Sequence, residues 1–199
     1  MILTPITASE LPGMLQAFEN GLRDCPLALA AFRRIAGTLK FAPHLQADLN
    51  AGRHKAVSFA RARGLATLDE DPARAFSWDG EYIRTLSETS VVFHEIAHWH
   101  VAPPARRPLY DFGLGAGPET GRIDEANAIA CVDAATKEDE ENLSSLLGIL
   151  WEAEHDEPAI LAFAEQNWLE LPDRPFTVRH FASCYDRLIA RGLITPIKD

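Results

Sequence analysis

The chain has 199 residues, a length typical of one domain, and its composition is that of an ordinary globular protein. Its formal net charge of −10 argues against a nucleic-acid-binding protein, because such binding depends on cationic side chains that neutralise phosphates. The same acidity argues against binding to anionic membrane surfaces. We therefore expect no nucleic-acid partner and no membrane association.

The cysteines indicate a reducing compartment. Cys25, Cys131 and Cys184 are far apart and form no CxxC pair, so a cysteine-based zinc site is not expected. Scattered cysteines in odd number are typical of reduced thiols in a cytoplasmic protein. The first residues lack the pattern of a signal peptide, and no stretch reaches the roughly 20 apolar residues of a membrane span. We expect one cytoplasmic domain over residues 1–199.

Apolar residues recur at helical spacing through most of the chain, and this periodicity predicts a mostly α (α+β) fold. In the first third of the chain we expect helices over residues 9–22, 26–35, 43–51 and 54–63. The stretch AFSWDGEYIRT, residues 75–85, is instead typical of strands, because aromatic and β-branched residues flank Asp79-Gly80, a preferred hairpin turn. A small β-hairpin is therefore expected there.

The residues after the predicted hairpin have the start and stop signals of a helix. Thr85 and Glu88 have the spacing of a capping box, and Pro103-Pro104 ends the helix because proline cannot donate a backbone hydrogen bond. We therefore predict a helix over residues 86–101. A long loop rich in proline and glycine follows at residues 102–122. Further helices are predicted over residues 124–136 and 139–155, from residue 158, and over residues 177–192.

The segment HEIAH, residues 94–98, matches the H-E-x-x-H pattern of metal sites. Residues four apart lie on one face of a helix, so His94 and His98 are predicted to point at one ion. Glu95 is expected to act beside that ion as a general base or proton carrier. Burying these polar residues in an apolar helix without a partner would be costly, and coordination of a metal supplies the partner.

A third protein ligand is expected from elsewhere in the chain. The metzincin extension of the motif is absent, because Val101 stands where that pattern has glycine. Glu125, at the start of a predicted downstream helix, is the preferred third ligand; its simpler interpretation is a favourable contact with the helix dipole. Asp111 is the main alternative, and Asp124 and Glu119 are further ones.

Other ionisable residues have simpler interpretations. His100 is two residues past His98, so we expect it to point away from the ion. The acidic segment EDEEN, residues 138–142, is interpreted as the solvated start of a helix. Arg106 and Arg107 lie in the long loop and are either a solvated pair or cations that guide an acidic protein partner to the site.

The run HEIAHWHVAPPARRPLYDFG, residues 94–113, resembles the elongation factor P hydroxylase family. The likeness rests on His98-Trp99, Ala105-Arg106-Arg107, Asp111-Phe112-Gly113 and, on a downstream helix, Glu125. It implies a hydroxylase with a two-histidine, one-carboxylate site, iron(II) as the favoured ion, and a modified lysine of elongation factor P as the substrate. It also implies that Arg106, Arg107 and Asp111 lie near the substrate.

The resemblance covers residues 86–125, and the segment before about residue 75 does not share it. After Asp111-Phe112-Gly113 the chain reads LGAGPETGR, where the family has an aromatic stretch that ends in Pro-Asp-Gly-Arg. This departure leaves the identity of the substrate more open than the identity of the metal ligands. The helices predicted after residue 139 carry no motif and are expected to form core and wall.

A second resemblance competes with the first. HEIAH together with DEANAIA, residues 124–130, resembles small gluzincin-type peptidases, which implies a zincin-like helical domain with zinc(II) and with Glu95 as the general base. Both interpretations use His94, His98 and Glu125 as ligands and differ in the metal and the reaction. A third hypothesis is a scaffold that acts through partner contacts. The sequence makes no prediction of the oligomeric state.

Overall fold

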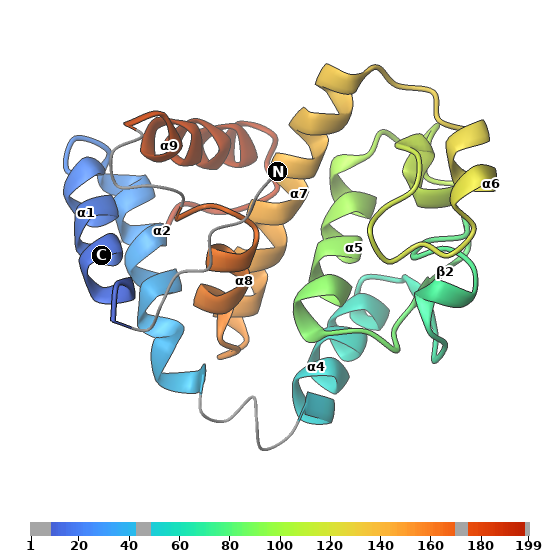
Figure 1. The fold of residues 1–199 in the computed structure, drawn as a ribbon, viewed down its shortest axis with the longest axis horizontal. Coiled ribbons are helices and arrows are strands. Elements are labelled where there is room, and N and C mark those ends of the chain that lie inside the picture. The colour runs from blue at the N-terminus through green and yellow to red at the C-terminus, as the bar shows by residue number, and fades with distance from the viewer. Residues whose placement is uncertain (1–8, 43–48, 170–174, 198–199) are drawn as a thin grey trace. The chain divides into compact units, whose positions relative to one another are not determined.

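The fold is described from a computed structural model of the chain, which describes residues 9–42, 49–169 and 175–197. The described residues are mostly helical and include one small two-stranded sheet, which confirms the predicted mostly α (α+β) class. The chain divides into two compact units (Figure 1). One unit consists of Met1–Pro43 and Ile149–Asp199, and the other of His44–Gly148, which contains the H-E-x-x-H motif.

The first unit is an assembly of helices around an aromatic core. Its elements are α1 (Leu11–Gly21), α2 (Pro26–Ala36), the 3-10 helix η1 (Gly37–Phe41), α8 (Ala159–Glu165) and α9 (Pro175–Ala190). The rings of Phe18, Phe32, Phe163 and Phe181 pack mostly edge to face or tilted, as aromatic groups prefer. The four α-helices confirm those predicted in these parts of the chain to within a few residues.

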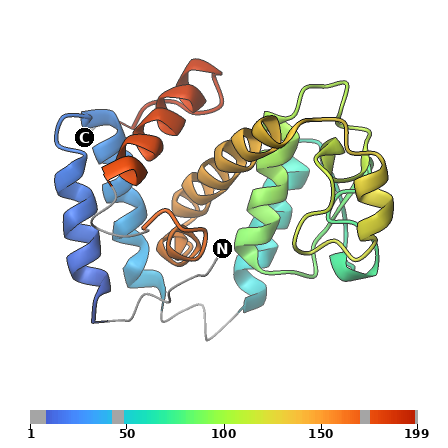
Figure 2. The ribbon, with the colours of Figure 1, turned by 45° about the horizontal axis from the view of Figure 1, so that its top comes forward.

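The second unit holds the small sheet and the motif helix. Its elements are α4 (Leu49–Ala62), β1 (Ala66–Leu68), η2 (Pro72–Arg74), β2 (Tyr82–Arg84), α5 (Thr89–Val101), η3 (Tyr110–Gly113), α6 (Ile123–Ala128) and residues 134–148 of α7 (Ala134–Glu154). Helix α4 lies beside α5 in both views (Figures 1 and 2), with the Phe59 and Phe93 rings 5.4 Å apart. Two short helices were expected at residues 43–51 and 54–63; one helix spans residues 49–62, and residues 43–48 lie outside the described residues.

The predicted hairpin is only partly formed. Its turn is present, since Trp78 and Ile83 form an antiparallel bridge around Asp79-Gly80. However, β2 has its ladder partner elsewhere, because it pairs in parallel with β1, with Thr67 opposite Ile83. Gly80 is required at the turn: its φ is 91°, and a β-carbon there would lie 2.4 Å from the carbonyl oxygen of Pro108.

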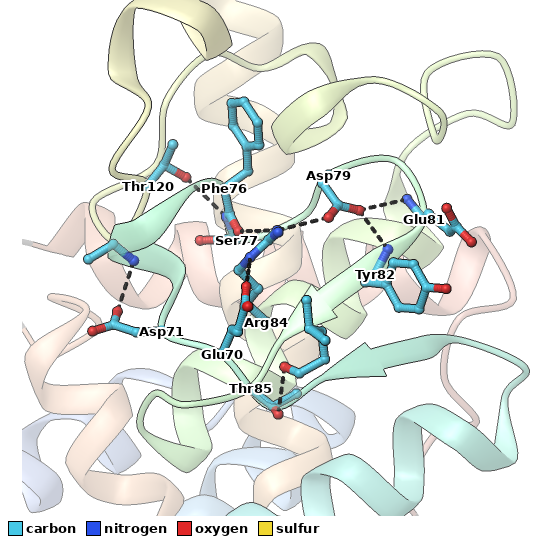
Figure 3. A network of polar contacts seen from close by, with 12 residues as sticks. Glu70, Asp71, Phe76, Ser77, Asp79, Glu81, Tyr82, Arg84, Thr85 and Thr120 are labelled. Atoms are coloured by element: carbon cyan, nitrogen blue, oxygen red, sulfur yellow. Dashed lines mark hydrogen bonds and ion pairs between the residues drawn. The ribbon is translucent and has the colours of Figure 1, made fainter.

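Arg84 holds this region together (Figure 3). Its guanidinium donates to the carboxylates of Glu70 and Asp79 at 3.3 and 2.9 Å, and to the carbonyl of Phe76 at 3.2 Å. The other carboxylate oxygen of Asp79 accepts from the backbone amides of Glu81 and Tyr82, so the side chain closes its own turn. These bonds fix the chain that leads into α5.

Helix α5 begins three residues later than predicted, at Thr89. The predicted capping box is wrong: Glu88 occupies the N-cap position without a side-chain cap bond. The hydroxyl of Thr85 instead donates to the carbonyl of Leu68 at 3.2 Å, because Thr85 is buried beside β1 (Figure 3). The helix ends at Val101, before the two prolines, as predicted.

The helix predicted over residues 124–136 stops early. Helix α6 ends at Ala128, and the amide of Cys131 turns away to donate to the carbonyl of Gly113 at 3.0 Å. A new helix, α7, begins after Asp133, whose carboxylate accepts from the amide of Thr136 at 2.7 Å in the manner of an N-cap. This restart sets the register of α7. Among the described helices, none combines the length and apolar character needed to cross a membrane.

Candidate metal centre

The motif histidines lie on one face of α5. Residues four apart lie on one face of a helix, and the two rings also turn toward each other, so their Nε2 atoms are 2.8 Å apart. The buried residues Phe93, Ile96 and Ala97 anchor this helix in the core. The structure therefore places the two predicted ligands together.

The carboxylate beside the two histidines is Glu141, which was not among the ligands predicted from the sequence. Its Oε2 lies 3.4 Å from Nε2 of His94 and 3.3 Å from Nε2 of His98. We call these three atoms the donor triad; among the described residues they lie close enough together to hold one metal ion. The His94 and Glu141 side chains are 20% and 36% exposed, whereas His98 is 6% exposed, so the triad opens toward solvent beside His94 and Glu141.

The geometry of the donor triad fits one ion. Donors that are about 2.1 Å from a metal lie about 3.0 Å apart at right angles and about 3.4 Å apart at the tetrahedral angle. The three separations in the triad, from 2.8 to 3.4 Å, span this range. Two imidazole nitrogens and one carboxylate oxygen also form the donor set that zinc and non-haem iron(II) prefer.

The two histidines of the triad differ in how readily they lose a proton to a cation. Burial lowers the pKa of His94, which favours the neutral imidazole that a metal requires. Burial would also lower the pKa of His98, but the hydrogen bond and charge of Glu141 outweigh it and raise this pKa, so a cation would displace a proton from the His98 ring. Burial alone would raise the pKa of Glu141, but hydrogen bonds from His94 and His98 outweigh it and hold this pKa well below its usual range. Glu141 is thus an anion beside two imidazoles, as a ligand set needs.

Two further residues contact His98. The hydroxyl oxygen of Ser144, which is fully buried, lies 3.1 Å from its Nδ1. The ring of Phe112 stacks on the imidazole at 5.6 Å between centroids and 20° between planes. Phe112 in turn stacks on Trp78, with centroids 5.4 Å apart. The ring of His98 is therefore held at one edge and on one face.

Glu95 is buried next to the triad. Burial raises its pKa to about 8; the charge of His98 opposes this rise, whereas the carboxylates of Asp111 and Glu141 add to it. The Glu95 carboxyl thus interacts electrostatically with residues of the triad, and the H-E-x-x-H pattern predicts that this residue transfers protons.

Asp111, the alternative ligand, has a structural role in the described contacts. Its carboxylate accepts from the amide of Trp78 at 3.3 Å and from the hydroxyl of Thr120 at 2.6 Å. Asp111 and Phe112 have φ values of 42° and 56°, a left-handed conformation that is uncommon outside glycine. The hydrogen bonds of Asp111 thus hold a strained turn that aims the Phe112 ring at His98.

The two arginines of the long loop contact other residues of the chain. Arg106 donates to the carbonyl of Phe112 at 3.0 Å and forms an ion pair with Glu140, with both side chains nearly buried. The guanidinium of Arg107 lies 3.9 Å above the ring of Trp99. Arg106 therefore ties the strained turn to α7, one residue before Glu141. The roles of both arginines toward a substrate stay predictions.

The structure does not bring Glu125 to the histidines. Its side chain is 56% exposed on α6 and pairs with Arg122 at 3.5 Å. Asp124 and Glu119, the further alternatives, are exposed. His100 is half-buried and is not part of the triad. Burial and the charge of Arg63 lower its pKa to about 4, so its ring stays neutral. In the structure, Glu141, and not Glu125, is the carboxylate beside the two histidines.

A sequence signal for Glu141 exists but is easily missed. Glu141, Ser144 and Gly148 are three and four residues apart, so they lie on one face of α7. A carboxylate, a hydroxyl and a glycine on one face indicate a helix that approaches another closely and presents polar groups to it. The acidic segment at residues 138–142 concealed this pattern, because most of its neighbours suit a solvated helix start.

Comparisons of the chain with protein-family models, with curated proteins and with solved structures found no match. The resemblance of residues 94–113 to elongation factor P hydroxylases therefore stays a prediction. The donor triad is the observation from which a function can be inferred.

Proposed function

We propose that this protein is a metal-dependent oxygenase in which His94, His98 and Glu141 hold a non-haem iron(II) ion. The observation that carries the proposal is the convergence of two imidazole nitrogens and one carboxylate oxygen within 3.4 Å of one another. Two histidines and one carboxylate, with the remaining positions open, are typical of iron(II) oxygenases.

In this proposal a bound iron(II) ion supplies the activation of dioxygen. His94, His98 and Glu141 bind the ion, and the exposure of His94 and Glu141 leaves a side from which a substrate can approach. Glu95 moves a proton at its buried carboxyl. Phe112 covers one face of His98 and excludes water from that side.

The substrate proposal rests on the sequence. The resemblance of residues 94–113 supports hydroxylation of a modified lysine on a protein such as elongation factor P. The three cysteines form no disulfide among the described residues, and this supports a cytoplasmic location, where thiols and iron(II) stay reduced.

A zinc metallopeptidase is the second candidate, and the burial of Glu95 favours it. Glu95 is buried and interacts electrostatically with His98, Asp111 and Glu141, and the H-E-x-x-H pattern assigns the general base of a peptidase to this residue. Zinc in the same site would polarise the scissile carbonyl. The ligands are those of the oxygenase, so metal content alone does not distinguish the two functions.

One experiment tests the proposed reaction. The iron(II)-loaded protein is incubated with dioxygen and elongation factor P from the same organism, and the intact mass of the substrate is measured. We expect a gain of one oxygen atom, which Glu141→Gln abolishes and Glu125→Gln does not. An unchanged substrate together with cleavage of a peptide library by the zinc-loaded protein would instead establish the peptidase. A protein that takes up no metal on reconstitution would refute both functions.

A further inference from the structure

The two histidines of the triad differ at the ring nitrogen that faces away from the ligand position. Nδ1 of His98 lies 3.1 Å from the hydroxyl oxygen of Ser144, a side chain with no exposed area. Nδ1 of His94 is buried and has no hydrogen-bond partner among the described residues. Ser144 therefore marks His98 as the histidine whose orientation the protein fixes.

The chemistry of imidazole gives this contact a consequence for metal binding. A neutral imidazole carries one proton, so a lone pair on Nε2 for a metal requires the proton on Nδ1. Ser144 can accept a hydrogen bond from that Nδ1–H. If the proton were on Nε2, the same hydroxyl could rotate and donate to Nδ1, so the contact survives the change of tautomer that accompanies metal binding.

The surroundings of His98 make Ser144 effective. Phe112 stacks on the ring face, and Ser144 lies at the Nδ1 edge, so rotation of the imidazole would lose both contacts. Ser144 and Glu141 are three residues apart on α7, so the helix that supplies the third donor also supplies the hydroxyl. One rigid element thus orients two of the three ligands.

We propose that Ser144 is a positioning residue of the metal site: its hydroxyl accepts the Nδ1–H of His98 and holds Nε2 toward the ion. Partners of this kind hold the ring orientation of a ligating histidine, and their loss typically weakens metal binding by about 10–100-fold. The inference rests on the proposed metal site and is independent of which reaction the site performs.

The test compares Ser144→Ala with Ser145→Ala, a matched control in which the next buried serine of α7 loses its hydroxyl. Zinc(II) affinity of the full chain is measured by competition with a chelator, and thermal unfolding is measured without metal. We expect Ser144→Ala to weaken zinc binding by about 10–100-fold and Ser145→Ala by less than about threefold. Ser144→Cys, which keeps the shape with a weaker hydrogen-bonding group, should fall between wild type and Ser144→Ala.

A second measurement does not depend on a variant. In the zinc-loaded wild-type protein with ¹⁵N-labelled histidine, the nitrogen spectrum should show His98 protonated at Nδ1 and metal-bound at Nε2. Equal zinc affinities of the two serine variants, or a His98 bound through Nδ1, would overturn the inference while leaving the metal site intact. If the wild-type protein binds no zinc and no iron, the proposed function fails together with the inference.

Discussion

Gly148 of α7 lies directly against the backbone of His94. A β-carbon at Gly148 would be 3.1 Å from both Cα and the amide nitrogen of His94, which is tighter than an ordinary van der Waals contact. The absence of a side chain therefore allows α7 to approach α5 closely at His94. Because Glu141 and Ser144 lie on the same face of α7 as Gly148, this approach brings both over the motif histidines.

Gly148→Ala should disturb the metal site without touching a ligand. The added methyl group meets backbone atoms that cannot rotate away, so α7 must shift from α5 and carry Glu141 with it. We expect a loss of about 1–3 kcal/mol in the free energy of unfolding, as for an overpacked core. Zinc affinity should fall as well.

Urea unfolding and a zinc titration measure the two effects. Gly37→Ala is the control, since a β-carbon there meets no atom within 4 Å. Unchanged zinc affinity in Gly148→Ala would show that the close approach of the helices does not determine the ligand geometry.

Replacing each of the two glutamates with glutamine, in separate variants, tests which of them is the third ligand. Glu141→Gln removes the anionic donor that lies 3.3 Å from His98 and 3.4 Å from His94. Loss of a residue that only hydrogen-bonds to a ligand weakens metal binding by up to about 100-fold, so loss of the ligand itself should weaken it by more. Glu125→Gln changes an exposed carboxylate and should leave affinity unaltered. Chelator competition measures both variants, and the reverse ranking would restore Glu125 as the ligand.

The ion pair between Arg106 and Glu140 should contribute to folding. Arg106→Leu leaves the carboxylate of Glu140 nearly buried and without its partner, which typically costs about 3–5 kcal/mol. The double variant Arg106→Leu/Glu140→Leu removes both charges and should be more stable than Arg106→Leu alone. Urea unfolding of Arg106→Leu, of Glu140→Leu and of the double variant, each compared with wild type, gives the coupling free energy between the two side chains.

A different outcome would point to a role of Arg106 in substrate binding. If Arg106→Leu unfolds at the wild-type urea concentration and loses only affinity for a protein substrate, the arginine guides the partner, as the sequence analysis allowed. Arg107→Leu is the companion variant, because its guanidinium stacks on Trp99 and makes no ion pair with Glu140.

Glu95→Gln should separate metal binding from turnover. The amide keeps the size of the carboxyl but cannot take up and release a proton, so activity should fall by the factor of about 10²–10⁴ typical of general acid–base groups. The three donors are untouched, so zinc affinity should stay within about threefold of wild type. Full activity in Glu95→Gln would exclude Glu95 as the proton carrier in either proposed reaction.

Local features of the sequence were sufficient for the motif helix. The spacing of His94 and His98 places both imidazoles on one face of any α-helix, and the two prolines after Val101 end that helix wherever it lies. The turn at Asp79-Gly80 was predictable for the same reason, because one side chain and one glycine close it locally.

Features that depend on distant contacts were not predictable in this way. The strand at residues 82–84 pairs with residues 66–68 rather than completing the hairpin, and Thr85 bonds to Leu68 rather than capping α5. In both cases a partner brought close by the fold replaces a local one.

The identity of the third donor shows most clearly the difference between features set by local spacing and features set by distant contacts. By itself, the sequence determined that two histidines and Glu95 meet on one helix, because helical spacing is a local property. Only the tertiary structure showed that Glu141, and not Glu125, lies beside the two histidines. Helix α6 ends at Ala128, and α7 begins after Asp133. The absence of a side chain at Gly148 allows α7 to contact the backbone of His94. A ligand from another helix depends on how two helices pack, and packing is not encoded in the spacing along either one.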